Sequence, residues 1–255
     1  MNIFRTIAVA FSMFSRIPMP KVAWRPESMR YMLCAFPLVG AVIGAAIWAW
    51  GWFCGMQNFG NILTAAGLTL IPIAITGGIH LDGFSDTIDA LASHAEPARK
   101  REILKDPNAG AFAIMGVCGY FLLYAALCTE LKLDRRTLLL LGAMHVLSRI
   151  LSGLSILCFQ TNSAKGLVRT FREESSGKYS VIVLLLFLML CASGMIYIDW
   201  ITGAAMLLAA FTVMIYLFFM SKKQFGGMSG DLAGYFLQTA ELTMLAVIAV
   251  TQWFR

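Results

Sequence analysis

"YMLCAFPLVGAVIGAAIWAWGWFC", residues 31–54, contains no charged side chain. A run of about 18 or more residues with few charges is long enough for a helix to cross the hydrocarbon core of a bilayer. Further runs of the same character lie near 61–79, 109–128, 137–160, 179–198, 200–220 and 232–252. The repeated pattern predicts an all-α, polytopic integral membrane protein with about seven transmembrane helices.

The overall composition agrees with this fold class. Of the 255 residues, 59% are hydrophobic and only 13% are charged, whereas soluble domains carry about 25% charged residues. No long polar stretch divides the chain, so we expect one membrane domain over residues 1–255. The six cysteines form no C-x-x-C pair, which disfavours a zinc site or a disulfide framework.

The first 20 residues, "MNIFRTIAVAFSMFSRIPMP", place one arginine on each side of a short apolar stretch. No small-residue cleavage site follows, so the segment does not fit a signal peptide. We interpret it as an interfacial or partly inserted helix that stays on the protein and contacts membrane lipid.

Lysine and arginine are distributed unevenly between alternate loops. Fifteen of the 20 lie in the N-terminal segment or near 21–30, 80–106, 161–178 and 221–230, against four on the other side. Cytoplasmic loops of membrane proteins are enriched in these residues, so we expect the first set to face the cytoplasm. The net charge of +6 has the same explanation, and no aromatic-basic pattern indicates a nucleic-acid partner.

The predicted cytoplasmic side also carries a group of aspartates. In "GGIHLDGFSDTIDALASH", residues 77–94, a helix would place Asp82, Asp86 and Asp89 at i, i+4 and i+7, on one stripe. Three like charges repel one another unless a cation lies against them, and Mg²⁺ prefers oxygen ligands of this kind. A solvated helix face is the alternative, but charge is scarce in this chain and apolar residues border the stripe. We therefore expect a magnesium site.

A second group of candidates lies in "GGMSGDLAGYFLQTAE", residues 226–241. Asp231 would stand at the start of the last membrane helix, on the same side as the other aspartates, and is a further predicted metal ligand. Glu241 would lie inside the membrane, where a carboxylate marks a functional or a paired site. Arg149, in the middle of another membrane helix, is an available partner. Pairing and direct substrate binding both remain open for these two residues.

Basic loop residues complete the pattern. Lys105, Lys165 and Arg169 are positioned to bind phosphates through charge-assisted hydrogen bonds, although positive loops are also usual on the cytoplasmic side. His80 is a candidate substrate ligand. Carboxylates, Mg²⁺ and basic loops on one membrane face indicate transfer of a phosphate-linked group.

Several motifs together resemble the adenosylcobinamide-GDP ribazoletransferase (cobalamin synthase) family. They are "FSRIP" at 14–18, "GGIHLDGFSDTIDAL" at 77–91, "ILKDPNAGAFA" at 103–113, "SR" at 148–149, "KGL" at 165–167 and "GGMSGD" at 226–231. They occur in the family's order over almost the whole chain. Three positions depart from the family pattern: Ala90 replaces a glycine, "DPN" replaces an Asp-Ser-basic string at 106–108, and Gln238 takes the place of a frequent glutamate.

The resemblance implies a reaction and a location. A ribose hydroxyl of α-ribazole, or of α-ribazole 5′-phosphate, attacks adenosylcobinamide-GDP; adenosylcobalamin or its 5′-phosphate forms and GMP leaves. Mg²⁺ is the implied cofactor and the bacterial inner membrane the implied location, with the active site on the cytoplasmic side. The catalytic triad maps onto Asp82, Asp86 and Asp89, and similarity to CDP-alcohol phosphotransferases suggests Asp89 as the base. The predicted substrate-binding residues are His80, Lys105, Asp106, Arg149, Lys165, Arg169 and Glu241.

Two other classes of function were weighed against this one. A CDP-alcohol or prenyl-type membrane transferase also uses spaced aspartates and Mg²⁺, but this chain lacks the second Asp-Gly of the former and the second aspartate motif of the latter. A transporter would use Arg149 and Glu241 on an ion route and would leave the aspartate triad unexplained. The sequence allows a homo-oligomer but does not indicate one.

Overall fold

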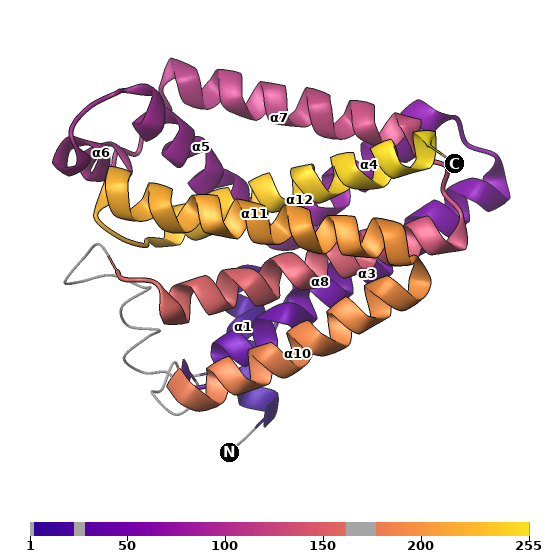
Figure 1. The fold of residues 1–255 in the computed structure, drawn as a ribbon, viewed down its shortest axis with the longest axis horizontal. Helices are drawn as coiled ribbons and strands as arrows, with labels where there is room; N and C mark the ends of the chain where they lie inside the picture. Colours follow the sequence, from indigo (N-terminus) through magenta and orange to yellow (C-terminus); the bar gives the residue numbers. More distant parts are fainter. Residues whose placement is uncertain (1–2, 23–28, 162–176, 255) are drawn as a thin grey trace.

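A computed structural model describes residues 3–22, 29–161 and 177–254, and the regular elements among them are all helices (Figure 1). They are α1 (Ile3–Phe14), α3 (Met32–Gln57), α4 (Asn61–Thr76), α5 (Ile79–Ala92), α6 (Pro97–Ile103), α7 (Ala111–Glu130), α8 (Arg135–Cys158), α10 (Gly177–Ile198), α11 (Trp200–Phe225) and α12 (Gly230–Trp253). Within these residues, α3, α7, α8, α10, α11 and α12 are long and apolar enough to cross a membrane. The predicted all-α, polytopic membrane class is therefore confirmed.

The apolar run at 61–79 forms a broken element and not a continuous membrane helix. Helix α4 has 16 residues, which corresponds to about 24 Å of helix and is shorter than the hydrocarbon core. It ends at Gly77 and Gly78, whose φ angles of 70° and 81° are readily adopted only by glycine. Helix α5 then continues at a bend of 96°. The seventh predicted span is thus a bent pair, and its second helix carries the aspartates.

Helices α8 and α12 form the centre of the bundle, and α10 lies at its edge. In the most apolar window of each helix, 78% of α8 is buried against 61% of α12 and 11% of α10. Helix α3 packs against α8 through small residues: a methyl group at Gly44 would lie 2.7 Å from the Cα of Gly142. Small residues allow membrane helices to approach closely, so this contact fixes α8 against α3.

Helix α1 has 12 residues, too few to cross a bilayer. Ala8, Val9 and Phe11 are buried, and the helix packs against α3. Ile3 and Phe4 at its start are exposed. The helix predicted at the N-terminus is confirmed, and its interfacial position stays a prediction.

Two of the loops that were predicted to be cytoplasmic, 80–106 and 221–230, lie at one end of the bundle. At the left of Figure 1, α6 lies beside the end of α11. Basic residues of α6 and of the last turn of α11, including Lys222 and Lys223, lie at this end. We call it the basic end. The α7–α8 and α10–α11 connections and the C-terminus lie at the opposite end.

Candidate active site

Helix α5 presents the three predicted acids on the side that is not buried in the bundle. Phe84 and Thr87 are among its buried residues, whereas Asp82 is exposed and Asp86 and Asp89 are half-buried. Because side chains at i, i+4 and i+7 share one helix face, the three carboxylates form the predicted acidic stripe.

Helix α12 brings a fourth acid to the same place. Ser229 caps its N-terminus with its side chain, and Asp231 lies in the first turn. A methyl group at Gly83 would lie 2.8 Å from the Cα of Asp231, and one at Gly234 would lie 2.7 Å from the carbonyl oxygen of His80. The backbones of α5 and α12 therefore touch through glycines, which sets Asp231 beside the acidic stripe. We call Asp82, Asp86, Asp89 and Asp231 the acidic cluster.

The negative charges of the acidic cluster affect the ionisation of Asp86. This residue lies in the middle of α5, outside the six helices that are each long and apolar enough to span a membrane. Partial burial, followed by the negative charges of Asp82, Asp231 and Asp89, raises the pKa of Asp86 to about 6. Burial and nearby like charges both disfavour a charged carboxylate. A cation at the cluster would offset this repulsion.

The acidic cluster does not by itself form a closed metal site. Across residues 3–22, 29–161 and 177–254, no three His, Cys, Asp or Glu side chains are grouped closely enough to hold a metal ion by themselves. Mg²⁺ commonly uses one or two carboxylates and completes its coordination with waters and substrate phosphates. The predicted ligands Asp82, Asp86, Asp89 and Asp231 offer hard oxygen donors for such a site, and magnesium binding stays a prediction.

The loop after α6 carries two of the predicted substrate ligands. Lys105 and Asp106 are exposed. The Asp106 carboxylate accepts hydrogen bonds from the backbone and side-chain nitrogens of Asn108, both at 2.9 Å, and these bonds lower the pKa of Asp106. Asn108, at a position where the chain departs from the family pattern, thus orients Asp106. Lys165 and Arg169 lie outside the described residues.

Arg149 and Glu241 form a buried ion pair between α8 and α12. The Glu241 carboxylate also lies 3.2 Å from Nδ1 of His145 and accepts a hydrogen bond from Ser148 at 2.7 Å. All four side chains are fully buried; Arg149 and Glu241 are each 1% exposed. The sequence left pairing and direct substrate binding open for Arg149 and Glu241, and the structure shows that they pair. Direct contact of either residue with substrate stays a prediction.

Comparison with known proteins places the chain in a family. A family model described as cobalamin-5-phosphate synthase matches residues 6–249. The chain belongs to this family. The matched region contains the acidic cluster and the buried ion pair, and it confirms the resemblance that the sequence motifs indicate.

Curated members of the cobalamin-5-phosphate synthase family align over nearly the full length. Each of the following is named adenosylcobinamide-GDP ribazoletransferase. The protein from Lachnoclostridium phytofermentans is 41% identical, over 97% of this chain and 95% of its own. One from Clostridium perfringens is 32% identical, over 97% and 98%, and one from Geobacillus kaustophilus is 30% identical, over 94% and 93%. No solved structure matches the chain significantly.

Sequence reasoning missed the glycines that shape the site of this family member. Gly83 and Gly234 allow α5 to touch α12, and Gly110 leaves room for the Asp89 carboxylate, whose atoms lie 2.3–2.6 Å from the position of a methyl group there. The "HLDG" and "GDLAG" strings did contain Gly83 and Gly234, but a single sequence does not show which glycines meet another helix.

Gly110→Ala is therefore expected to displace the Asp89 carboxylate and to lower turnover by about tenfold. The bundle should stay folded, because the atoms that meet the added methyl are the movable end of a side chain. Gly119→Ala, inside the helix α7 that Gly110 caps and with nothing within 4 Å of the added methyl, is the matched control. Initial rates and thermal stability of the two variants should be compared. Equal rates would contradict the placement of Asp89 against Gly110.

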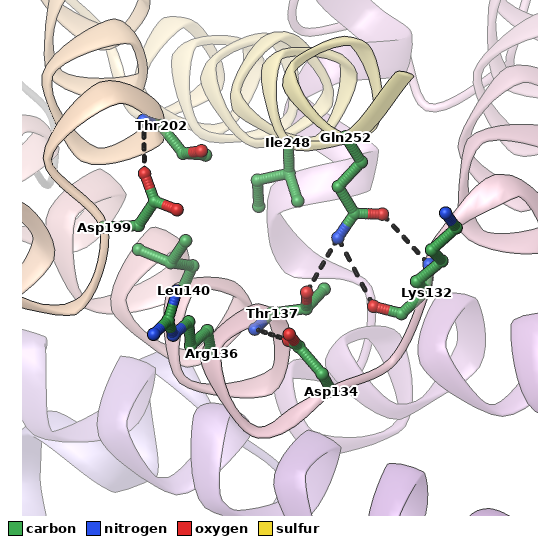
Figure 2. Close-up of a pocket in the computed structure, with 9 residues that line it drawn as sticks. All are labelled: Lys132, Asp134, Arg136, Thr137, Leu140, Asp199, Thr202, Ile248 and Gln252. Atoms are coloured by element: carbon green, nitrogen blue, oxygen red, sulfur yellow. Dashed lines mark hydrogen bonds between the residues drawn. The ribbon is translucent and has the colours of Figure 1, made fainter. Parts of the chain in front are cut away.

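A polar pocket at the opposite end of the bundle is unlike the acidic cluster. It has a volume of about 270 Å³, and Figure 2 shows its polar groups joined to one another. Asp134 and Asp199 accept hydrogen bonds from first-turn amides of α8 and α11. Gln252 bonds the backbone of Lys132 and the hydroxyl of Thr137. These groups cap helices and tie their ends together, so the acidic cluster is the better candidate for chemistry.

Proposed function

We propose that the protein joins adenosylcobinamide-GDP to α-ribazole, or to α-ribazole 5′-phosphate, and releases GMP. The product is adenosylcobalamin or its 5′-phosphate. Family membership and the names of the full-length relatives support this reaction. The structural observation that carries it is the meeting of α5 with the start of α12, which groups Asp82 and Asp86 with Asp231 at the basic end.

The chemistry requires one bond to form and one to break. A ribose hydroxyl oxygen of the acceptor bonds to the phosphorus on the cobinamide side, and the bond from that phosphorus to the oxygen of GMP breaks. Asp89, the proposed base, accepts the hydroxyl proton. Asp82, Asp86 and Asp231 would hold Mg²⁺, which would supply charge compensation at the phosphates. Lys105, Lys165 and Arg169 bind the phosphates, and Asp106 and His80 contact the substrates.

The proposed location follows from the charge of the loops. The basic end carries Arg99, Lys100 and Arg101 of α6 and Lys222 and Lys223 of α11, which favours its placement on the cytoplasmic side of the bacterial inner membrane. Membrane lipid then surrounds helices such as α10, whose side chains are mostly exposed. Both substrates reach the acidic cluster from the cytoplasm in this arrangement.

The direct test is a GMP-release assay with the purified full chain in lipid vesicles. We expect GMP from adenosylcobinamide-GDP only when Mg²⁺ and α-ribazole or its 5′-phosphate are both present. The same preparation is offered CDP-diacylglycerol with an alcohol acceptor, and a prenyl pyrophosphate. Turnover of either alternative, with no acceptor-dependent GMP release, would overturn the proposal.

Binding of Mg²⁺ should stabilise the protein more at about pH 7.5 than at about pH 5. Without metal, protonated Asp86 contributes to stability because its pKa is about 6 in the folded protein against an ordinary 3.8. This contribution is complete below about pH 4 and is lost as pH rises through about 6. Above that pH the ionised cluster gains most from a bound cation. Thermal unfolding is measured with and without Mg²⁺ at both pH values and at matched ionic strength. An equal rise in unfolding temperature with Mg²⁺ at both pH values would contradict the placement of Mg²⁺ at Asp86. The variant Asp86→Asn should show the same rise at both pH values.

A further inference from the structure

A cavity of about 150 Å³ lies beside the acidic cluster, between α1, α3, α5, α8 and α12. Asp82 and Asp231 are among the residues that line it, so the cavity and the cluster share a border. The cavity thus offers space for a chemical group attached to whatever reacts at the aspartates.

Flat aromatic side chains form part of the wall. The rings of Phe14 and Phe36 have their centroids 4.2 Å apart, and the His80 ring lies 6.3 Å from Phe14 and 5.7 Å from Phe36. Ile156 and Leu237 add aliphatic surface. Aromatic walls favour offset stacking with another ring, so the lining suits a flat and largely apolar group.

Two polar atoms in this lining lack a partner. His80 is 6% exposed and Ser152 is 0% exposed, and neither Nε2 of His80 nor the Ser152 hydroxyl forms a hydrogen bond within the described residues. Buried polar groups are almost always satisfied by protein, water or ligand. An apolar cavity with two unsatisfied polar atoms is therefore suited to a ring that has one polar edge.

Size and polarity distinguish between the parts of the two substrates. An apolar cavity of about 150 Å³ accommodates benzene, so a corrin ring is far too large for this one. Guanine presents N7, O6 and an exocyclic amino group, more polar groups than His80 and Ser152 can satisfy. The base of α-ribazole, 5,6-dimethylbenzimidazole, is a hydrocarbon-rich bicycle with a single free ring nitrogen.

We propose that this cavity binds the flat heteroaromatic base of the acceptor nucleoside, with His80 or Ser152 donating a hydrogen bond to its free ring nitrogen. The attached ribose then lies at the border with Asp82 and Asp231, where its hydroxyl is needed. The identity of the acceptor rests on the proposed function, but binding of the base is measurable without any turnover.

The test uses 5,6-dimethylbenzimidazole alone as the probe, without Mg²⁺ or donor, in calorimetric titration of the full chain in micelles. Ser152→Leu fills the cavity and should abolish binding. His80→Phe keeps the ring and removes Nε2, and should weaken binding about tenfold, as expected for one hydrogen bond. His94→Asn, which removes an exposed histidine just beyond the C-terminal end of α5, is the control and should bind normally. Unchanged binding by both cavity variants would overturn the proposal.

A second measurement needs no folded variant. In wild-type turnover the free base should raise the KM for the acceptor and leave the KM for adenosylcobinamide-GDP unchanged. Competition with adenosylcobinamide-GDP instead would show that the cavity holds the donor, and the proposal would be wrong. If the protein binds 5,6-dimethylbenzimidazole but releases no GMP, the proposed function is wrong and the proposed cavity stands. If it releases GMP but 5,6-dimethylbenzimidazole does not compete with the acceptor, the proposed cavity is wrong and the proposed function stands.

Discussion

Asp82→Asn is expected to lower the rate of GMP release by about 10²- to 10³-fold, the size of effect seen when one preorganised electrostatic group is removed from an active site. Asparagine has almost the same shape as aspartate, so packing between α5 and α12 is retained. The negative charge is lost from the exposed member of the acidic cluster. Affinity for Mg²⁺ and charge compensation at the phosphates should fall together.

Glu102→Gln is the matched control for this loss of charge. Glu102 lies at the same end of the bundle on α6 and pairs with Arg99, and both side chains are more than 60% exposed. Exposed pairs of this kind contribute little to stability, so we expect normal rates. Rates and the Mg²⁺-dependent rise in unfolding temperature should be measured for both variants. Full activity of Asp82→Asn would refute the metal assignment.

Glu241→Ala is expected to destabilise the protein by about 3–5 kcal/mol, because it leaves the Arg149 guanidinium buried without its counterion. His145 and Ser148 accompany the pair in the same buried network, so no water-filled route is at hand to hydrate the charge. The unfolding temperature in micelles should fall by roughly 10 °C or more, and the yield of folded protein should fall with it.

The double variant Arg149→Met, Glu241→Met separates pairing from chemistry. Removing both charges removes the unpaired ion, so the double variant should be more stable than either single variant. A double variant as unstable as the sum of the single changes would contradict a purely pairwise role. If the double variant folds and still releases GMP, the pair is structural; if it folds and is inactive, Arg149 or Glu241 takes part in substrate binding.

Much of the architecture could be predicted because a membrane imposes strong rules on sequence. Uncharged runs such as 31–54 mark their own helices, and the spacing of Asp82, Asp86 and Asp89 is sufficient to place them on one face. Arg149 and Glu241 could be recognised as potential partners because isolated charges in a bilayer are unfavourable.

Other features depend on contacts between distant parts of the chain. The run at 61–79 contains no charge that would mark the end of a helix, and the bend depends on the left-handed conformation of Gly77 and Gly78. The approach of Gly83 to Asp231 joins two helices that one sequence cannot pair. The cavity beside His80 arises only when five helices are assembled. These features set the geometry of the site, and no periodic pattern of residues in the sequence predicts them.

The 92 residues that separate Arg149 from Glu241 also impose an order on biosynthesis. Ribosomes make α8 well before α12, so the arginine enters the translocon while its counterion has yet to be translated. Insertion of one arginine at the centre of a nascent membrane helix costs about 2.5–3.5 kcal/mol, which the leucine-rich remainder of α8 must offset. Translation and insertion of α12 are then the steps that bring Glu241 to Arg149 and close this contact.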